Sequence, residues 1–551
     1  MSMKFIIGLF LVFAQGLPAS ASFHDSLQEK QSFAEYLESA STQARLDELT
    51  RSEETQNDVN LLHLGMNTDP VRRKMLKNAK SHVHMIIPYW HNDNLGKEWI
   101  ELFKEKRAEI PDLDTRFMVD WTTPVSSKDR KMEKQFAEIK DFSDDNLRVW
   151  NPPKWLRRWS LSILSNHQHD KVYLVDGKEA ILGGMNIGDH YLEGGLTAEG
   201  WHDTDLYIKG LAAHELEATF LKTWHLVGYL NDDHRNPFPF LKRKIIGLLD
   251  SFFYGPIESA IEFQGLFGRD RLFDSGVAKE LQNQRYFPEI DDLSSDAAPV
   301  RIIYDIPLVD KRIEKETITR FSKSPTDRRE TTITHIRKRS KYMETLTELI
   351  QNAHGRVRIF LPYLTLTRQF KKEIILAAER GVQIQLFTNS YESHDLGKYA
   401  YYGAIQHYVK LMEAGVEIYE WTGHGPLHEI QDENNCSIEG HWPGRTLHTK
   451  AVTIDGLVGI VGSHNMNVRS TIYNSEVMAM VRGRDFTNSL DAVFDSHLVQ
   501  AFGGDSGSVR CGEQDYALPP RVKRKTLQEV KDFIRDNRIK VLIARPLQMI
   551  M

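Results

Sequence analysis

Two short runs of the sequence, NHQHDKVYLVDG and RTLHTKAVTIDG, carry the same polar residues at the same spacing, H-x-K-x-x-x-x-D. The matching residues are His169, Lys171 and Asp176 in the first run and His448, Lys450 and Asp455 in the second. A histidine and a lysine two positions apart in an extended segment point to the same side, so each run can present both to one ligand. Two runs in register are far rarer by chance than one, which favours a shared chemical role over two unrelated strand histidines.

Each run is followed by a second apolar segment that ends at an asparagine. These segments are GGMNIG, with Asn186, and GSHNMN, with Ser463 and Asn465. The separation between histidine and asparagine is 17 residues in both halves, 186 − 169 and 465 − 448. The β-forming residues VYLV and AVTI, each followed by Asp-Gly, predict a hairpin that returns the asparagine toward the histidine. We expect Asp176 and Asp455 to be structural residues at these turns, and Ser463 to belong to the same framework.

Residues of these types can catalyse displacement at a phosphodiester. One neutral imidazole attacks phosphorus and forms a covalent phosphohistidine, while the other donates a proton to the leaving alkoxide and then deprotonates the incoming water or alcohol. Two lysines and two asparagines can hold the phosphate oxygens as negative charge redistributes, and this electrostatic role needs no metal ion. We therefore expect a reaction without a metal or another cofactor.

A carboxylate that is hydrogen-bonded to a catalytic histidine fixes the tautomer of the imidazole and stabilises its protonated form. Glu476, in YNSEV, is one candidate and lies 28 residues after His448. The first half has Thr197 at that spacing, and its WHDTD segment offers Asp203 instead. We expect Glu476 to raise the pKa of His448 and make it the general acid, which leaves His169 as the neutral nucleophile. Ion-pair roles for Glu476 and Asp203 are the alternative.

The segments ahead of the two runs also repeat, with an offset of 274 residues (362 − 88). The segments VRRKMLKNAKSHVHMIIPYW (71–90) and YMETLTELIQNAHGRVRIFLPYL (342–364) each predict a helix, a turn and a strand that ends in Pro-Tyr. A further helix and strand follow in each half. This alternation predicts an α/β protein with two similar halves and sheets rich in parallel strands.

The paired motifs resemble those of the phospholipase D superfamily, and the resemblance extends from about residue 55 to about residue 505. The stretches NSYESHDLGKYAYYGAIQHYVKLMEAGVEIYEW and RSTIYNSE resemble bacterial cardiolipin synthases and related phosphatidyltransferases. This resemblance implies an α/β fold of two similar α-β-α sandwich domains, related by a pseudo-two-fold axis, with one active site at their interface. It also implies a catalytic carboxylate at Glu476 and favours the first motif as the nucleophile.

The N-terminus has the pattern of an export signal. A short positive start with Lys4 precedes ten nearly all apolar residues (5–14) and the cleavage pattern Ala19-Ser20-Ala21. Ten residues are too few to span a hydrocarbon core of about 30 Å. We expect a mature chain that is periplasmic or secreted, soluble or peripherally attached to a membrane, with a buried N-terminal helix as the alternative.

Six segments make up the expected organisation. They are a signal peptide (1–21), an N-terminal extension (22–55), a first phospholipase D-like domain (56–230), a linker with an amphipathic apolar segment (231–297), a second phospholipase D-like domain (298–505) and a C-terminal extension (506–551). The two cysteines, Cys436 and Cys511, are too few for a disulfide scaffold or a multi-cysteine metal cluster.

Composition helps to choose between lipid and nucleic acid as the substrate. Asp and Glu outnumber Lys and Arg by 76 to 70, which argues against nonspecific nucleic-acid binding. The Trp- and Arg-rich segment 154–165 suits a headgroup interface, and the apolar segment 238–267 suits either an interfacial helix or one packed between domains. We expect a glycerophospholipid substrate at a membrane surface, with water or an alcohol as acceptor. A nuclease or phosphodiesterase acting on nucleic acid, and a non-catalytic binding module, are the alternatives.

Overall fold

The computed structural model describes residues 32–120, 146–150, 167–192, 200–231, 279–290, 293–305, 340–395, 398–422, 446–501, 508–511, 514–517 and 522–544. The strands of the first half are β1 (Thr55–His63), β2 (His82–Ile86), β3 (Asp114–Asp120), β4 (Leu147–Trp150), β5 (Val172–Val175), β6 (Glu179–Gly183), β7 (Trp201–His202) and β8 (Thr204–Gly210). Those of the second half are β9 (Ala298–Asp305), β10 (Arg356–Phe360), β11 (Gln383–Asn389), β12 (Glu417–Trp421), β13 (Thr446–Leu447), β14 (Ala451–Ile454), β15 (Val458–Gly462) and β16 (Glu476–Arg482).

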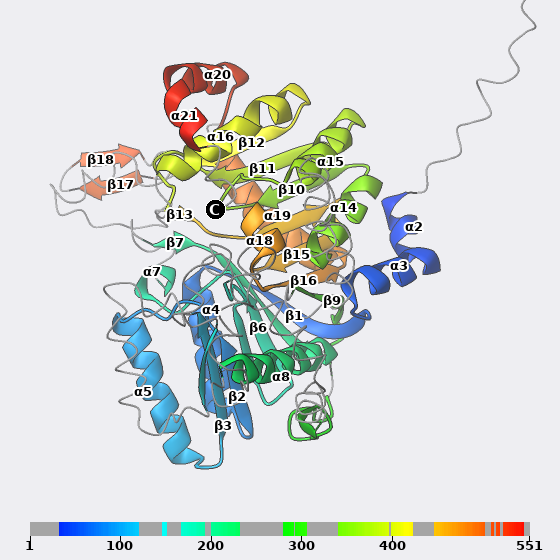
Figure 1. The fold of residues 1–551 in the computed structure, drawn as a ribbon, viewed down its shortest axis with the longest axis vertical. Helices are drawn as coiled ribbons and strands as arrows, with labels where there is room; N and C mark the ends of the chain where they lie inside the picture. The colour runs from blue at the N-terminus through cyan, green and yellow to red at the C-terminus, as the bar shows by residue number, and fades with distance from the viewer. Residues whose placement is uncertain are drawn as a thin grey trace, which may run out of the picture.

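A single mixed sheet of fifteen strands runs through both halves (Figure 1). The first half contributes the order β4-β3-β2-β5-β6-β8-β1, and the second half contributes the matching order β12-β11-β10-β14-β15-β16-β9. The halves join where β1 and β9 pair in antiparallel fashion, and β19 (Val522–Arg524) extends the far edge beside β12. The expected α/β class is confirmed, and the two halves share one sheet.

The expectation of sheets rich in parallel strands is wrong. In the described fifteen-stranded sheet only β2–β3, β3–β4, β10–β11 and β11–β12 are parallel pairs, and the other ten pairs are antiparallel. The parallel pairs come from the helix-containing repeats, since a parallel connection needs a long crossover. The motif hairpins and the strands after them add antiparallel neighbours, because short turns can join only antiparallel strands.

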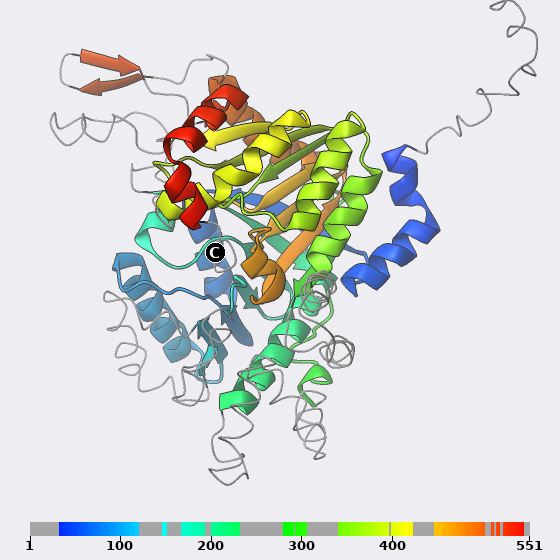
Figure 2. The same cartoon turned by 45° about the horizontal axis from the view of Figure 1, so that its top comes forward.

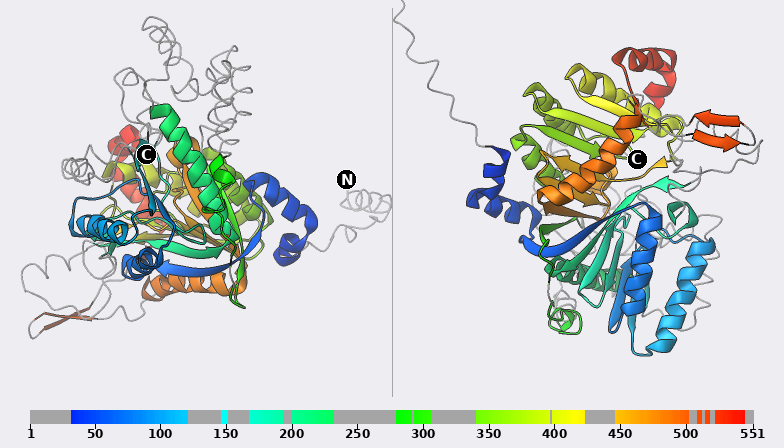
Figure 3. Two further views of the ribbon diagram at one scale, coloured as in Figure 1. Left: turned by 90° about the horizontal axis from the view of Figure 1, so that it is seen from below. Right: turned by 180° about the vertical axis from the view of Figure 1, so that it is seen from behind.

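Helices cover both faces of the sheet and divide the core into three clusters. On one face, α4 (Gly65–Asn78) and α5 (Asn94–Glu109) cover the first half, and α14 (Lys341–Asn352), α15 (Arg368–Glu379) and α16 (Lys398–Glu413) cover the second. On the other face, α8 (Leu211–Asn231) and α19 (Arg484–Ala501) share one apolar cluster with strands of both halves. Figure 3 shows α19, in orange, crossing the second half when the molecule is seen from behind. This common cluster fixes the two halves against each other.

Local sequence explains where the helices begin and which face they bury. Thr367 caps α15 by accepting from the Phe370 N–H, and Phe370, Ile374 and Ala377 then recur at helical spacing and are buried. Ser340 caps α14 in the same way. Among the described helices, none is both long and apolar enough to cross a membrane.

Both terminal extensions pack against the second half where they are described. The helices α2 (Phe33–Glu38) and α3 (Ala40–Thr50) lie beside α14, as Figure 2 shows in blue and green. The helices α20 (Leu527–Asp536) and α21 (Arg538–Ala544) pack on α16, and the hairpin of β17 (Ser508–Cys511) and β18 (Gln514–Ala517) precedes them. The signal peptide, the segments 154–165 and 238–267, and Cys436 lie outside the described residues.

Candidate active site

The two motif histidines lie in extended segments that run alongside the opposite half of the molecule. The backbone N–H of His169 donates to Ser475 O at 3.2 Å, and that of His448 donates to His202 O at 2.7 Å. Beside His448, β13 and β7 pair in parallel across the junction. The regular strands β5 and β14 begin only after the motif lysines, since the histidine segments bond to the other half instead. Both histidines therefore lie at the junction of the halves.

Each motif histidine is hydrogen-bonded to a carboxylate of the other half. His169 Nδ1 lies 2.9 Å from Oε2 of Glu476, and His448 Nδ1 lies 2.6 Å from Oδ2 of Asp203. The expected action of Glu476 on His448 is therefore wrong. Spacing within one half suggested that pairing, whereas the short β-ladders across the junction determine which carboxylate each histidine meets.

Asp203 and Glu476 occupy equivalent positions in the two halves. In the first half, Gly183 at the end of β6 pairs with Asp205, and Asp203 lies two residues before Asp205. In the second half, Gly462 at the end of β15 pairs with Met478, and Glu476 lies two residues before Met478. The separation from the motif histidine is 34 residues in the first half (203 − 169) and 28 in the second (476 − 448). Six additional residues in the first half thus hide the correspondence from a comparison of spacing.

The surroundings of His169 favour a neutral imidazole. Burial, and then the positive charges of Lys171 and Lys450, hold the pKa of His169 well below its usual range. Burial also raises the pKa of Glu476. The side chain of His169 is 15% exposed, against 6% for His448. An uncharged and more accessible imidazole is what nucleophilic attack requires.

Asp203 is placed to support a protonated His448. Burial by itself would raise the pKa of Asp203, but the charges of His448 and Lys450 outweigh it and lower that pKa. Burial and then Lys450 lower the pKa of His448, and Asp203 opposes them. An anion bound beside the lysines would offset their charge, so that His448 could carry the proton for a leaving group.

Both motif lysines are buried and fold back toward the histidine that precedes them. Lys171 Nζ donates to His169 O at 2.7 Å, and Lys450 Nζ donates to His448 O. Burial lowers the pKa of Lys171 to about 8 and that of Lys450 to about 7. When both buried lysines are protonated, their positive charges repel each other. An anionic ligand between them would stabilise both charged forms, so the pair favours binding of an anion.

We expect kcat/KM to fall as the pH rises through about 7 to about 8, because the lysines of the free enzyme lose their protons in this range. Bound phosphodiester raises both pKa values, so kcat should persist to higher pH. Initial rates on a water-soluble phosphodiester across this range test the prediction. Lys450→Arg stays cationic and should move the alkaline fall upward. A wild-type kcat/KM that stays level across this range would contradict it.

The two asparagines have different partners. Asn186 donates through Nδ2 to Tyr191 Oη at 2.7 Å and accepts through Oδ1 from the Tyr89 N–H at 3.3 Å. The Oδ1 atom of Asn465 is buried and has no hydrogen-bond partner among the described residues. This oxygen could therefore accept a hydrogen bond from a ligand, whereas both the Oδ1 and the Nδ2 atoms of Asn186 already have partners.

Ser463 orients the carboxylate of Glu476. Its Oγ donates to Glu476 Oε2 at 2.6 Å and accepts from the Val477 N–H at 3.0 Å. The equivalent position in the first half is Gly184, where a Cβ would lie 2.1 Å from Asp203 Oδ1. The first half therefore has no room for a serine at this position, and the two histidine–carboxylate pairs differ in their support.

The two motif aspartates tie their hairpins to the neighbouring strands. Both have positive φ, 54° at Asp176 and 52° at Asp455, and each is followed by a glycine of positive φ, as in a type I′ turn. Their carboxylates accept from the backbone N–H groups of Lys80, Ser81 and His82, and of His354, Gly355 and Arg356. These carboxylates face the turns before β2 and β10.

Several residues near the site were not found from the sequence. The rings of Tyr191 and Trp201 lie 5.7 and 5.1 Å from that of His448, between centroids. Asp395 accepts from Tyr363 Oη at 2.7 Å and acts electrostatically on His448. Tyr191, Trp201 and Asp395 have no counterpart of the same type at the equivalent position of the other half, so the repeat could not identify them. The one indication in the sequence was that Trp201 lies close to Asp203 in WHDTD.

A family model described as "Cardiolipin synthase, PLD-like domain" matches residues 346–498, which include the second motif together with Asn465 and Glu476. The match and the relatives described next show distant homology to PLD-like cardiolipin synthases. The matched region contains one of the two histidines and the carboxylate that contacts the other. The first half supplies the remaining residues of the site.

Individual relatives of this PLD-like protein are remote. It is 23% identical to cardiolipin synthase 2 of Staphylococcus epidermidis over 420 residues, which cover 76% of this chain and 63% of the relative. It is 23% identical to cardiolipin synthase C of Escherichia coli over 363 residues, which cover 65% of this chain and 67% of the relative. The crystal structure of phosphatidylserine synthase from Haemophilus influenzae aligns with a TM-score of 0.53 at 12% identity, over 92% of this chain and 100% of that one. The fold is therefore shared with that enzyme.

Proposed function

We propose that this PLD-like protein transfers or hydrolyses the phosphatidyl group of glycerophospholipids through a covalent phosphohistidine at His169. The observation that carries the proposal is the crossed pair of histidine–carboxylate contacts at the junction, with two buried lysines beside them. The names of the relatives, cardiolipin synthases and a phosphatidylserine synthase, support a phospholipid substrate.

In the first step Lys171, Lys450 and Asn465 bind the non-bridging phosphate oxygens. Because the Nδ1 of His169 is occupied by Glu476, its Nε2 attacks phosphorus. The P–O bond to the leaving alkoxide breaks, and His448 donates its proton to that oxygen. The products are a phosphatidyl group on His169 and a free alcohol.

In the second step His448, now neutral, accepts the proton of an incoming hydroxyl group, and the oxygen displaces Nε2 of His169 from phosphorus. An alcohol as acceptor gives a new phosphodiester, and water gives phosphatidic acid. The same side chains serve both outcomes, so the shape of the pocket and the exclusion of water select between them.

The test is to incubate the purified mature protein with phosphatidylglycerol liposomes, with and without deuterated glycerol, and identify the products by mass spectrometry. Transfer should give cardiolipin, or deuterated phosphatidylglycerol when labelled glycerol is present, and hydrolysis should give phosphatidic acid. His169→Ala protein should give none of these. Cleavage of an oligonucleotide by a protein that leaves every lipid intact would overturn the proposal in favour of the nuclease alternative.

We also propose that the protein is exported, on the basis of its N-terminal sequence. Cleavage after Ala21 would leave Ser22 as the first residue and a net charge of −7 (69 − 76). We expect N-terminal sequencing or intact-mass measurement of protein from native cells to find Ser22. A chain that begins at an intact Met1 would contradict export.

We propose that α21 holds the enzyme at the lipid surface. Three of its seven residues are large, apolar and exposed, Ile539 (74%), Leu542 (58%) and Ile543 (57%), although its other side is buried against α16. Arg538 and Lys540 are its only charged residues. Apolar side chains flanked by cations suit insertion among anionic headgroups. Figure 2 shows α21, in red, beside α16, in yellow. Asp395 precedes α16 by three residues in the sequence.

Replacing Ile539 and Leu542 by aspartate is expected to lower binding to phosphatidylglycerol vesicles by at least about tenfold, since each buried aliphatic side chain contributes about 1.5–3 kcal/mol. Co-sedimentation with sucrose-loaded vesicles measures the change. Leu211→Asp is the matched control, because Leu211 is also exposed but begins α8 in the first half. Equal loss of binding in both variants, or in neither, would contradict the assignment. Activity on a monomeric short-chain phospholipid should be unchanged.

A further inference from the structure

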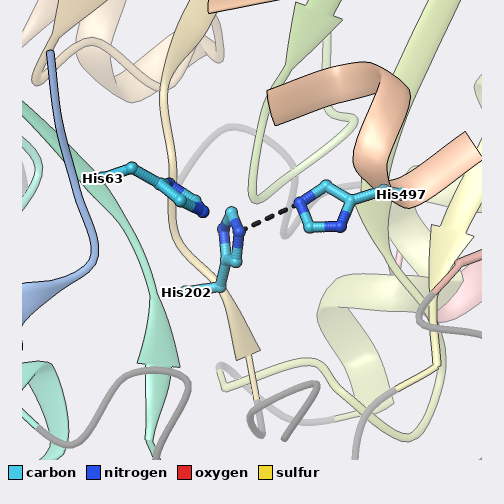
Figure 4. A group of neighbouring side chains, drawn as sticks. All are labelled: His63, His202 and His497. Atoms are coloured by element: carbon cyan, nitrogen blue, oxygen red, sulfur yellow. Dashed lines mark hydrogen bonds between the residues drawn. The ribbon is translucent and has the colours of Figure 1, made fainter. Parts of the chain in front are cut away.

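Three histidines from distant parts of the sequence meet behind the His448–Asp203 pair. They are His63 at the end of β1, His202 in β7 and His497 in α19. One ring nitrogen of each lies within 4.8 Å of the other two, and the Nε2 atoms of His202 and His497 are 3.0 Å apart. Figure 4 shows the three rings turned toward a common region.

The Nδ1 atoms of two of these rings lie within hydrogen-bond distance of threonine hydroxyl groups. His63 Nδ1 lies 3.2 Å from Thr204 Oγ1, and His202 Nδ1 lies 3.2 Å from Thr449 Oγ1. A hydroxyl oxygen can accept a hydrogen bond from Nδ1–H, and in that tautomer the lone pair of the ring lies on Nε2, on the other side of the ring. Such a bond to the second nitrogen is how proteins orient histidines that bind metals.

We propose that His63, His202 and His497 bind one transition-metal ion of the zinc class. Zinc–nitrogen bonds of about 2.0–2.1 Å place two ligands of a tetrahedral site about 3.3 Å apart, close to the 3.0 Å between His202 and His497. The three imidazoles would leave the fourth position to water. Imidazole nitrogen is a common ligand for ions of this class.

The ion would hold the two halves together at the active site. His63 and His202 belong to the first half, and His497 belongs to the second. The carbonyl of His202 accepts from the backbone N–H groups of His448 and Thr449, and Asp203 is the next residue. Fixing His202 would therefore fix the distance between His448 and its carboxylate. The ion takes no part in the chemical step, so the expectation of metal-free chemistry is unaffected.

The site can be tested by measuring zinc in full-length protein that has been stripped with a chelator and dialysed against zinc. We expect His497→Gln to bind about one equivalent less per chain than wild type. Glutamine can keep a hydrogen bond to His202 but is a poor zinc ligand, so the variant separates a metal site from a hydrogen-bonded histidine pair. His354→Gln, at an exposed histidine outside the cluster, should bind as much as wild type.

Zinc should also raise the Tm of wild type by a few degrees and that of His497→Gln by less. Two other clusters, His82–His84–Glu217 and His91–Asp93–His190, could take up zinc, so the difference between variant and wild type carries the result. Equal zinc content in the two proteins, or no zinc in wild type, would overturn the proposal. If His497→Gln fails to fold, X-ray absorption of zinc-loaded wild type decides, because a shell without three imidazole nitrogens would also overturn it.

Discussion

His169→Ala and His448→Ala are each expected to lower kcat on phospholipid by at least about 10³-fold, because each removes a group that the reaction needs. The two variants should differ on a nitrophenyl phosphodiester, since nitrophenolate leaves without a proton. His448→Ala should release about one equivalent of nitrophenolate per site and then stop, because no base activates the acceptor. His169→Ala should release none. Stopped-flow absorbance and mass spectrometry of the acid-quenched protein measure the burst and its adduct.

The adduct in His448→Ala should map to the peptide that contains His169. His354→Ala, which changes an exposed histidine away from the site, should keep wild-type turnover, and all three variants should keep the wild-type Tm. A burst in His169→Ala but not in His448→Ala would reverse the assignment. Turnover above a few per cent of wild type in either active-site variant would refute a mechanism that uses both histidines.

Glu476→Gln and Asp203→Asn are expected to damage different steps, because each carboxylate contacts the histidine of the other half. Glu476→Gln should slow the nitrophenolate burst by about 10²- to 10⁴-fold, since it removes the group that holds the tautomer of the nucleophile. Asp203→Asn should leave the burst near the wild-type rate and slow phospholipid turnover by a similar factor, since that step needs the proton of His448.

Rapid-mixing rates on the nitrophenyl substrate and steady-state rates on phospholipid, compared for both variants, measure the contrast. The opposite pattern, in which Asp203→Asn abolishes the burst and Glu476→Gln spares it, is what pairing within each half would produce. That result would contradict the crossed arrangement. Equal loss of both rates in the two variants would show that the carboxylates do not serve separate histidines.

The sequence predicted the local parts of the site. The Asp-Gly turns predict the β5–β6 and β14–β15 hairpins, and both form, with Val175 opposite Glu179 and Ile454 opposite Val458. The 17-residue separation of histidine and asparagine follows from the same hairpins. These features depend on residues close together in the chain, so turn chemistry and the alternation of side chains are enough to predict them.

The fold as a whole was predicted only in part. The helix–turn–strand repeat gave the α/β class and two matching halves, but it overestimated the share of parallel pairs. Alternating helices and strands identify parallel neighbours where a helix connects them. They do not indicate which strands pair next to the motif hairpins in the sheet, or that the two halves join through β1 and β9.

The tertiary structure alone decided which groups form the site. The bond between His169 and Glu476 joins residues 307 apart in the chain, and that between His448 and Asp203 joins residues 245 apart. Residue spacing describes neighbours on one element, whereas these contacts depend on how the halves pack through β1, β9 and the shared core of α8 and α19. The sequence therefore determined which residues could do the chemistry, and the packing of the two halves determined which of them act together.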